Sequence, residues 1–184
     1  MHHHLAIPEI YDKLGWTITE RDEDVARDMD INHGIDYVLQ DQYGRRISVQ
    51  ERFRESTYAK YNDATLRFRR DQNKHADRVE SESYKIKADY LVYGICNGKK
   101  ATPTGITTFL KWVVVDIKFL QQKFREGLLL FASTGSIYCR QDGNKMICPE
   151  NKNPDGSSSF RPFDVRIMYQ LWGDEPILAQ QGFL

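Results

Sequence analysis

A carboxylate, an amide and a guanidinium fall on two neighbouring segments with strand character. Asp36 lies within residues 34–39, and Gln50 and Arg52 lie two residues apart within residues 46–54. Carboxylate and amide oxygens are ligands for a hard cation such as Mg²⁺, and a guanidinium binds phosphate. These three side chains could therefore form one compact metal and phosphate site.

A β-hairpin over residues 34–54 would bring these side chains together. Residues 41–44 (Asp-Gln-Tyr-Gly) supply turn chemistry between two strands that are rich in β-branched and aromatic residues. Alternation along the second strand points a mostly apolar set inward, namely Ile47, Val49, Glu51 and Phe53. It leaves Gln50 and Arg52 side by side on the opposite, exposed face, next to Asp36 on the first strand.

At these residues the chain resembles the PD-(D/E)XK nuclease superfamily, which has the restriction-endonuclease-like fold. The family pattern is a helix with an acid, a strand with Asp, a turn, and a strand with Glu or Gln, any residue and Lys. Over roughly residues 5–95, the same order is predicted here, with Asp36 on the first strand and Gln50-Glu51-Arg52 on the second. Gln stands in place of the commoner Glu, and Arg in place of Lys.

The resemblance implies a metal-dependent phosphodiesterase that cuts DNA. Asp36 and Gln50 would hold Mg²⁺ or Mn²⁺, and Arg52 would stabilise the charge that develops on the phosphate. Arg52 cannot act as a general base, because a guanidinium stays protonated up to roughly pH 12. A shifted register with Glu51 as the acid would put Phe53 at the Lys position, where it has no chemical role.

The helix acid of the family pattern matches Glu9. Apolar residues recur at helical spacing from Leu5 to Leu14, and Gly15 ends the pattern. Glu20 and Glu23 compete with Glu9 for the same role.

Basic residues follow the candidate site along the chain. Residues 9–36 hold nine acids against three bases, and residues 45–74 hold nine bases against four acids. A metal site needs the acids and a phosphate track needs the bases. The predicted nucleic-acid contacts are Arg54, Arg67, Arg69, Lys85 and Lys87, with Arg67 and Arg69 on one face of a strand over residues 65–70.

Composition limits the class of protein. The chain has 184 residues, a formal net charge of zero and 40% hydrophobic residues, which suits one globular domain and no membrane span. Cys96, Cys139 and Cys148 follow no paired-CxxC spacing, so we expect free thiols in a reducing cytoplasm, although Cys139 and Cys148 could meet across a hairpin. We interpret residues 1–4, with three consecutive histidines, as a tag remnant and leave them out of the site.

The expected fold is α/β or α+β, with a mixed central sheet flanked by helices. Further strands are predicted over residues 84–96, 112–116, 128–139 and 146–148, and a helix over 119–125. Residues 20–32 and 151–159 are expected to be loops, and residues 160–184 show no clear period.

The leading hypothesis is a Mg²⁺-dependent DNA endonuclease of restriction or repair type, acting on double-stranded DNA and forming a homodimer. One alternative is a non-catalytic nucleic-acid-binding module that keeps the nuclease fold. Another is a protein-interaction domain, which the neutral net charge favours, since many DNA-binding domains are basic.

Overall fold

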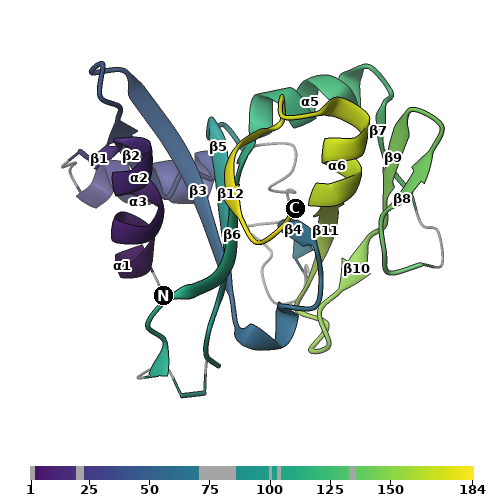
Figure 1. The fold of residues 1–184 in the computed structure, drawn as a ribbon, viewed down its shortest axis with the longest axis horizontal. Coiled ribbons are helices and arrows are strands. Elements are labelled where there is room, and N and C mark those ends of the chain that lie inside the picture. Colours follow the sequence, from purple (N-terminus) through teal and green to yellow (C-terminus); the bar gives the residue numbers. More distant parts are fainter. Residues whose placement is uncertain (1–2, 20–22, 71–85, 100, 103–104, 133–135) are drawn as a thin grey trace. The chain divides into compact units, whose positions relative to one another are not determined.

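The computed structural model describes residues 3–19, 23–70, 86–99, 101–102, 105–132 and 136–184, without the side chains of residues 23–27, 69 and 70. Figure 1 shows its helices and strands. The contacts divide the chain into two compact units, of which unit 1 comprises Met1–Tyr61, Lys87–Ile117 and Ile177–Leu184, and unit 2 comprises Asn62–Ile86 and Lys118–Pro176. That these units fold together as one domain stays a prediction.

Unit 1 is built on a six-stranded sheet with the order β1-β2-β3-β5-β6-β12. Its strands are β1 (Thr17–Ile18), β2 (Tyr37–Gln40), β3 (Arg46–Arg54), β5 (Tyr90–Cys96), β6 (Phe109–Asp116) and β12 (Ile177–Gln181). The β3–β5 pair is parallel, and the other pairs are antiparallel. The predicted mixed sheet and the β2–β3 hairpin are therefore confirmed.

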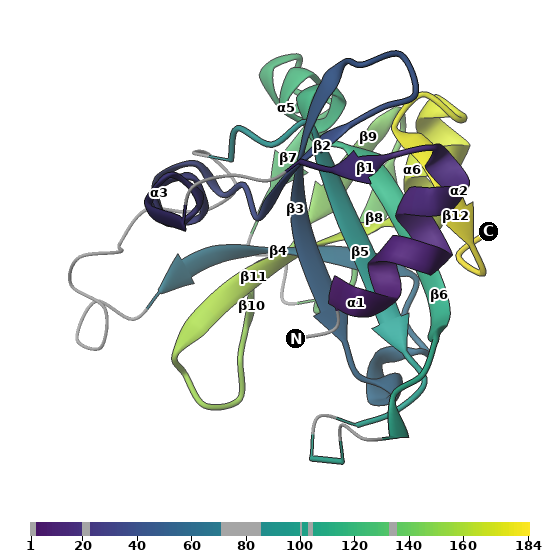
Figure 2. The same ribbon diagram turned by 90° about the vertical axis from the view of Figure 1, so that its left-hand side faces the viewer.

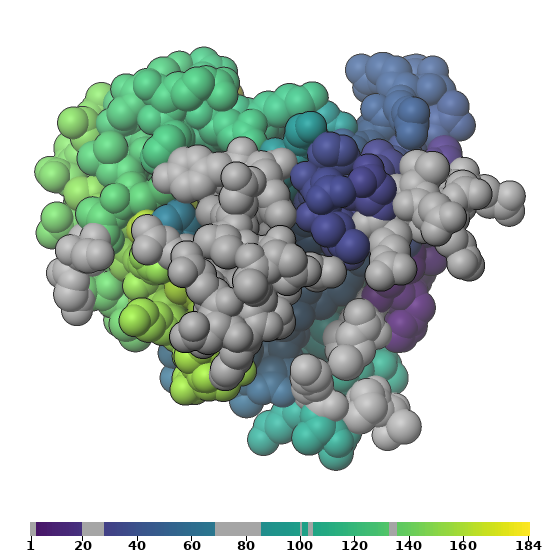
Figure 3. All heavy atoms as spheres, turned by 180° about the vertical axis from the view of Figure 1, so that it is seen from behind, coloured from purple at the N-terminus to yellow at the C-terminus, as the bar shows by residue number. Residues whose placement is uncertain are grey.

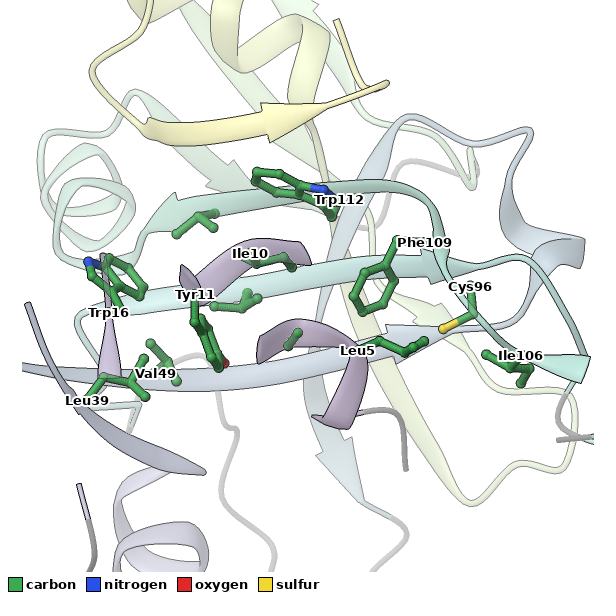
Figure 4. Packing of buried hydrophobic residues seen from close by; sticks show 13 residues of the cluster. Leu5, Ile10, Tyr11, Trp16, Leu39, Val49, Cys96, Ile106, Phe109 and Trp112 are labelled. Atoms are coloured by element: carbon green, nitrogen blue, oxygen red, sulfur yellow. The ribbon is translucent and has the colours of Figure 1, made fainter. Parts of the chain in front are cut away.

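A helical segment at the N-terminus covers one face of this sheet (Figure 2). It consists of α1 (His3–Ala6), the π-helical η1 (Ile7–Tyr11) and α2 (Asp12–Leu14). It ends at Gly15, whose φ of 66° is a left-handed conformation that glycine adopts without a Cβ penalty. Figure 4 shows that Ile10 and Tyr11 point from the helix into an apolar cluster with Val49 on β3. The predicted helix over residues 5–14 is confirmed.

The acidic segment before the hairpin is helical, so the predicted loop over residues 20–32 is wrong for its described part. Helix α3 spans Glu23–His33, and Figure 3 shows part of it on the molecular surface. Asn32 Nδ2 donates to Asp28 Oδ1 at 2.6 Å, one turn apart. Acidic residues were therefore compatible with a surface helix as well as with a loop.

Unit 2 contains two three-stranded sheets. The first has the order β10 (Asn151–Lys152), β11 (Ser158–Asp164), β4 (Asp63–Arg70), and the second the order β7 (Leu129–Phe131), β9 (Lys145–Cys148), β8 (Arg140–Asp142). The remaining short elements are η2 (Ser56–Tyr58) in unit 1, and α5 (Ile117–Arg125) and α6 (Val165–Trp172), which belong to unit 2 apart from the first residue of α5. The chain as a whole is broadly α+β, with several sheets and few helices.

Several predicted boundaries need correction. The strand expected over residues 84–96 begins only at Tyr90 in β5, and the strand expected over 128–139 is the shorter β7. The predicted loop at 151–159 contributes β10 and the start of β11, which pair as a hairpin. The segment without a clear period contains α6, and Asp164 caps this helix by accepting from the amides of Arg166 and Ile167.

Candidate metal and phosphate site

The turn from α3 into β2 positions Asp36 beside β3. Gly34 has a φ of 59°, which reverses the chain after α3. The amide of Asp36 then donates to Val49 O at 2.9 Å, which begins the ladder between the two strands. Asp36 thus enters the sheet at the point where β3 carries Gln50.

Asp36 and Gln50 are in direct contact. Asp36 Oδ2 accepts hydrogen bonds from Gln50 Nε2 and from the backbone amide of Glu51, each at 2.6 Å. The carboxylate therefore takes the place of the next backbone acceptor in the ladder, because the chain before Asp36 has turned away into α3. The two predicted side chains therefore meet, although Asp36 lies one residue before β2 and not on the strand as predicted, because the chain leaves the ladder there toward α3.

Strand β3 is in register with the parallel strand β5, where Gln50 lies beside Leu91, Arg52 beside Tyr93 and Arg54 beside Ile95. Residues in register point to the same face of a sheet. These β5 residues are at most 1% exposed, and the three β3 side chains are half-buried. The expectation of an open, exposed face is therefore wrong, because a buried strand lies beside β3. The lower dielectric of such a position strengthens the interactions of a charged side chain there.

Arg54 is held near the end of β3 by an aromatic ring. Its guanidinium carbon lies 4.3 Å from the centroid of the Tyr58 ring in η2, a cation–π geometry. This contact orients the arginine on the face that also carries Gln50.

Glu51 points to the opposite face of β3 and forms a second polar cluster under the N-terminal helix. Tyr11 Oη donates to Glu51 Oε1, and His3 Nδ1 lies 2.7 Å from the same oxygen. The His3 ring also stacks on Tyr37, with centroids 3.8 Å apart. Burial raises the pKa of Tyr11 well above its ordinary range, and the charges of Glu51 and then Asp36 add to this effect.

Sequence reasoning did not assign Tyr11 or Glu51 to the site, and it left His3 out as a tag residue. The available signal was an inward-facing carboxylate on β3 opposite a helix whose apolar face contains a tyrosine. A buried tyrosine hydroxyl and a buried carboxylate each require a hydrogen-bond partner, so their pairing was a physical expectation. What the sequence did not indicate was the contact of His3 with Glu51.

Glu9 is engaged away from Asp36. Its carboxylate accepts from the amide of Phe109 on β6, with Oε1 and Oε2 at 3.1 and 3.3 Å. Phe109 pairs with Cys96 on β5, whereas Gln50 pairs with Leu91. Five residues along a strand correspond to roughly 16 Å. The structure therefore does not bring Glu9 to the Asp36–Gln50 contact, because the carboxylate binds an amide beside the β5–β6 register shift.

The other predicted residues lie elsewhere or outside the described part of the chain. Glu20 and Lys85 are outside the described residues, and the side chain of Glu23 at the start of α3 is not described. Lys87 is exposed, and its amide donates to His33 O at 2.9 Å.

Arg67 and Arg69 lie on β4, in unit 2. They pair with Phe160 and Ser159, which are adjacent on β11, so Phe68 is the extra residue of a register shift. A bulge interrupts strand alternation. The predicted common face for the two arginines is therefore no longer fixed by their spacing.

Asp36 and Gln50 carry side-chain oxygens of the kind that bind a hard cation. Within the described residues there is no group of three His, Cys, Asp or Glu side chains that could hold a metal ion. Mg²⁺ requires less, since one or two carboxylates with water commonly hold it. Adjacent oxygens around an octahedral Mg²⁺ lie about 3.0 Å apart, given Mg–O distances of about 2.1 Å. The Asp36–Gln50 contact is a 2.6 Å hydrogen bond donated by Nε2, so a cation between the two side chains would require the Gln50 amide to rotate and present Oε1.

Comparisons with protein-family models, with curated protein sequences and with solved structures found no match. Across the described ranges, no helix is both long enough and apolar enough to cross a membrane.

We predict that Tyr11→Phe lowers the free energy of unfolding by about 1.5–3 kcal/mol, because it removes a hydrogen bond to the carboxylate of Glu51, whose side chain is 8% exposed. Urea denaturation measures the change. Tyr43→Phe is the matched control, since Tyr43 is 74% exposed and should change stability by less than about 0.5 kcal/mol. Equal effects of the two substitutions would show that the Glu51 cluster contributes nothing to stability.

Proposed function

We propose that the protein is a Mg²⁺- or Mn²⁺-dependent DNA endonuclease with the restriction-endonuclease-like fold. The observation that carries the proposal is the contact between the carboxylate of Asp36 and the amide of Gln50, on the strand that also carries Arg52. The helix–strand–turn–strand order around this contact supports the same class. Double-stranded DNA as the partner, a homodimer and a cytoplasmic location belong to this proposal.

Each of the three side chains has one role in the proposed reaction. Asp36 and Gln50 hold the cation, and Asp36 supplies the negative charge of the pair. When bound, the cation supplies Lewis acidity and lowers the pKa of a coordinated water. Arg52 binds the scissile phosphate and stabilises the negative charge that grows on its oxygens. Because a guanidinium keeps its protons, Arg52 takes no proton from the attacking water.

The half-buried position of β3 supports this division of roles. One face of β3 carries Gln50, Arg52 and Arg54, so a phosphate bound at Arg52 also lies close to the line that joins the two guanidinium groups. Partial exclusion of water there strengthens the attraction between guanidinium and phosphate. Arg54 would then contact a neighbouring phosphate and position the backbone.

A non-catalytic nucleic-acid-binding module is the second candidate. The observation in its favour is the same hydrogen bond, since Gln50 Nε2 satisfies Asp36 Oδ2 without a metal. A protein-interaction domain is the third candidate, and the zero net charge favours it. These candidates differ from the nuclease in whether DNA is bound and whether it is cut.

Incubation with supercoiled plasmid and with linear DNA distinguishes the three candidates. The nuclease should nick or linearise DNA when Mg²⁺ or Mn²⁺ is present, and a chelator should stop the reaction. Binding without cleavage at any metal concentration would favour the non-catalytic module. Neither binding nor cleavage would favour the interaction domain. Parallel reactions with Asp36→Asn exclude a contaminating nuclease, because only activity of this chain depends on Asp36.

We predict that Arg67→Ala combined with Arg69→Ala weakens DNA binding and reduces its salt dependence. Each lost phosphate contact lowers the slope of log K against log salt by about one unit. Binding isotherms at several salt concentrations measure the slope, and exposed Arg125→Ala with Arg140→Ala is the matched control for loss of charge. An unchanged slope would mean that Arg67 and Arg69 are solvated surface residues that make no phosphate contact.

A further inference from the structure

Two cysteines face each other at the end of the β8–β9 hairpin. The strands pair from Asp142 with Lys145 to Arg140 with Ile147, so continuation of the register sets Cys139 opposite Cys148. Their sulfur atoms are 3.7 Å apart. Both residues belong to unit 2 and to the same hairpin, so this geometry depends on local register alone.

The hydrogen-bond pattern defines the kind of pair. Met146 N donates to Leu128 O, and Cys148 O accepts from Ala132 N. The backbone groups of Met146 and Cys148 are therefore directed toward β7 and away from β8. The Cys139–Cys148 pair is therefore a non-hydrogen-bonded pair of the antiparallel ladder. Such pairs have Cα atoms about 4.5 Å apart, within the range of about 4.4–6.8 Å that a disulfide needs. Rotation of the side chains can bring the sulfurs to bonding distance.

The two thiols differ in access and in chemistry. Cys148 is fully buried, and Arg161 Nη1 also donates to its carbonyl oxygen at 3.1 Å. Burial raises the pKa of the Cys148 thiol well above its ordinary value. Cys139 is half-buried, and its Sγ donates to Pro162 O at 3.1 Å. An oxidant from solvent therefore reaches Cys139 first, and the buried Cys148 is the resolving thiol.

We propose that Cys139 and Cys148 form a reversible oxidation site that closes to an intramolecular disulfide, with hydrogen peroxide as the oxidant. The proposal is independent of the nuclease function. In the first step the Cys139 thiolate attacks a peroxide oxygen, the O–O bond breaks, and hydroxide leaves, which gives a sulfenic acid. In the second step the Cys148 sulfur attacks the Cys139 sulfur, the S–S bond forms and the S–O bond breaks. The Cys148 proton and the leaving hydroxide become water, so two thiols reduce one peroxide to two waters.

The third cysteine provides an internal control. Cys96 is fully buried in unit 1, and burial, with a smaller contribution from the charge of Glu9, raises its pKa to about 11. Its thiolate is scarce near neutral pH, and we expect it to stay reduced when the pair is oxidised.

The test is peroxide treatment of the whole chain, followed by alkylation of thiols under denaturing conditions and intact mass measurement. The number of alkylated cysteines should fall from three to one. Before alkylation, the mass should fall by about 2 Da, and peptide mapping should link residues 139 and 148, with reversal by a thiol reductant. Cys139→Ser should abolish the mass loss, whereas Cys96→Ala should leave it intact.

A further variant keeps the proposal testable if Cys139→Ser fails to fold. In Cys148→Ala the Cys139 sulfenic acid has no resolving thiol, so a sulfenic-acid trapping reagent should label Cys139 in this variant more strongly than in the parent. The proposal is overturned if the folded parent keeps three alkylatable cysteines. It is also overturned if Cys139 reaches the sulfinic acid while Cys148 stays reduced, or if oxidation joins two chains instead of two residues of one chain.

Discussion

Asp36→Asn should abolish metal-dependent DNA cleavage, with a rate loss of more than roughly 100-fold. Loss of an outer-shell partner of a metal ligand costs up to about that factor, and loss of the charged ligand itself should cost more. The reason is specific to this site, because Gln50 brings no charge and Asp36 is the only carboxylate in the proposed ligand pair. Initial rates of plasmid nicking at saturating Mg²⁺ measure the change.

Folding and DNA binding should largely survive this substitution. The asparagine oxygen can still accept from the amide of Glu51, so we expect a loss of about 1–2 kcal/mol in the free energy of unfolding. Thermal melting checks the fold, and binding in the presence of a chelator checks the DNA interface. Asp142→Asn is the control, since Asp142 is exposed on β8 in unit 2. Full cleavage by Asp36→Asn would end the assignment of this residue as a metal ligand.

Arg52→Ala should lower the cleavage rate by about 10²- to 10³-fold, as loss of one charge-stabilising donor commonly does. Arg52→Lys separates two ways in which the arginine can act. If Arg52 supplies only positive charge, lysine retains substantial activity, as the Lys of the resembled family pattern suggests. If its planar fork binds a phosphate through two donors, lysine fails nearly as badly as alanine.

Rates for both Arg52 variants at saturating Mg²⁺ decide between these roles. Lys60→Ala serves as the control for removal of a cation, because Lys60 is exposed and lies outside β3. Should neither Arg52 variant differ from the parent, the segment Gln50-Glu51-Arg52 is not the catalytic strand. The nuclease proposal would then lose its main support, and the interaction-domain hypothesis would lead.

The features that the sequence determined by itself are local. Turn residues at 41–44 and period-two alternation on each side define the β2–β3 hairpin, and the hairpin places Asp36, one residue before β2, opposite Gln50. Helical spacing from Leu5 to Leu14 and the stop at Gly15 define the N-terminal helix. Each of these depends on neighbours within a few residues or across one turn, where backbone geometry leaves few alternatives.

The tertiary structure decided which element lies beside which. Alternation predicts that Gln50 and Glu51 occupy opposite faces of β3. It does not predict that β5 lies beside that strand and that both faces are at least half-buried. It also does not state that Tyr11 meets Glu51, or that Glu9 binds the amide of Phe109. These contacts join residues 40 and 100 positions apart. They depend on how the helix packs on the completed sheet, because the hydrophobic effect favours burial without specifying the partner.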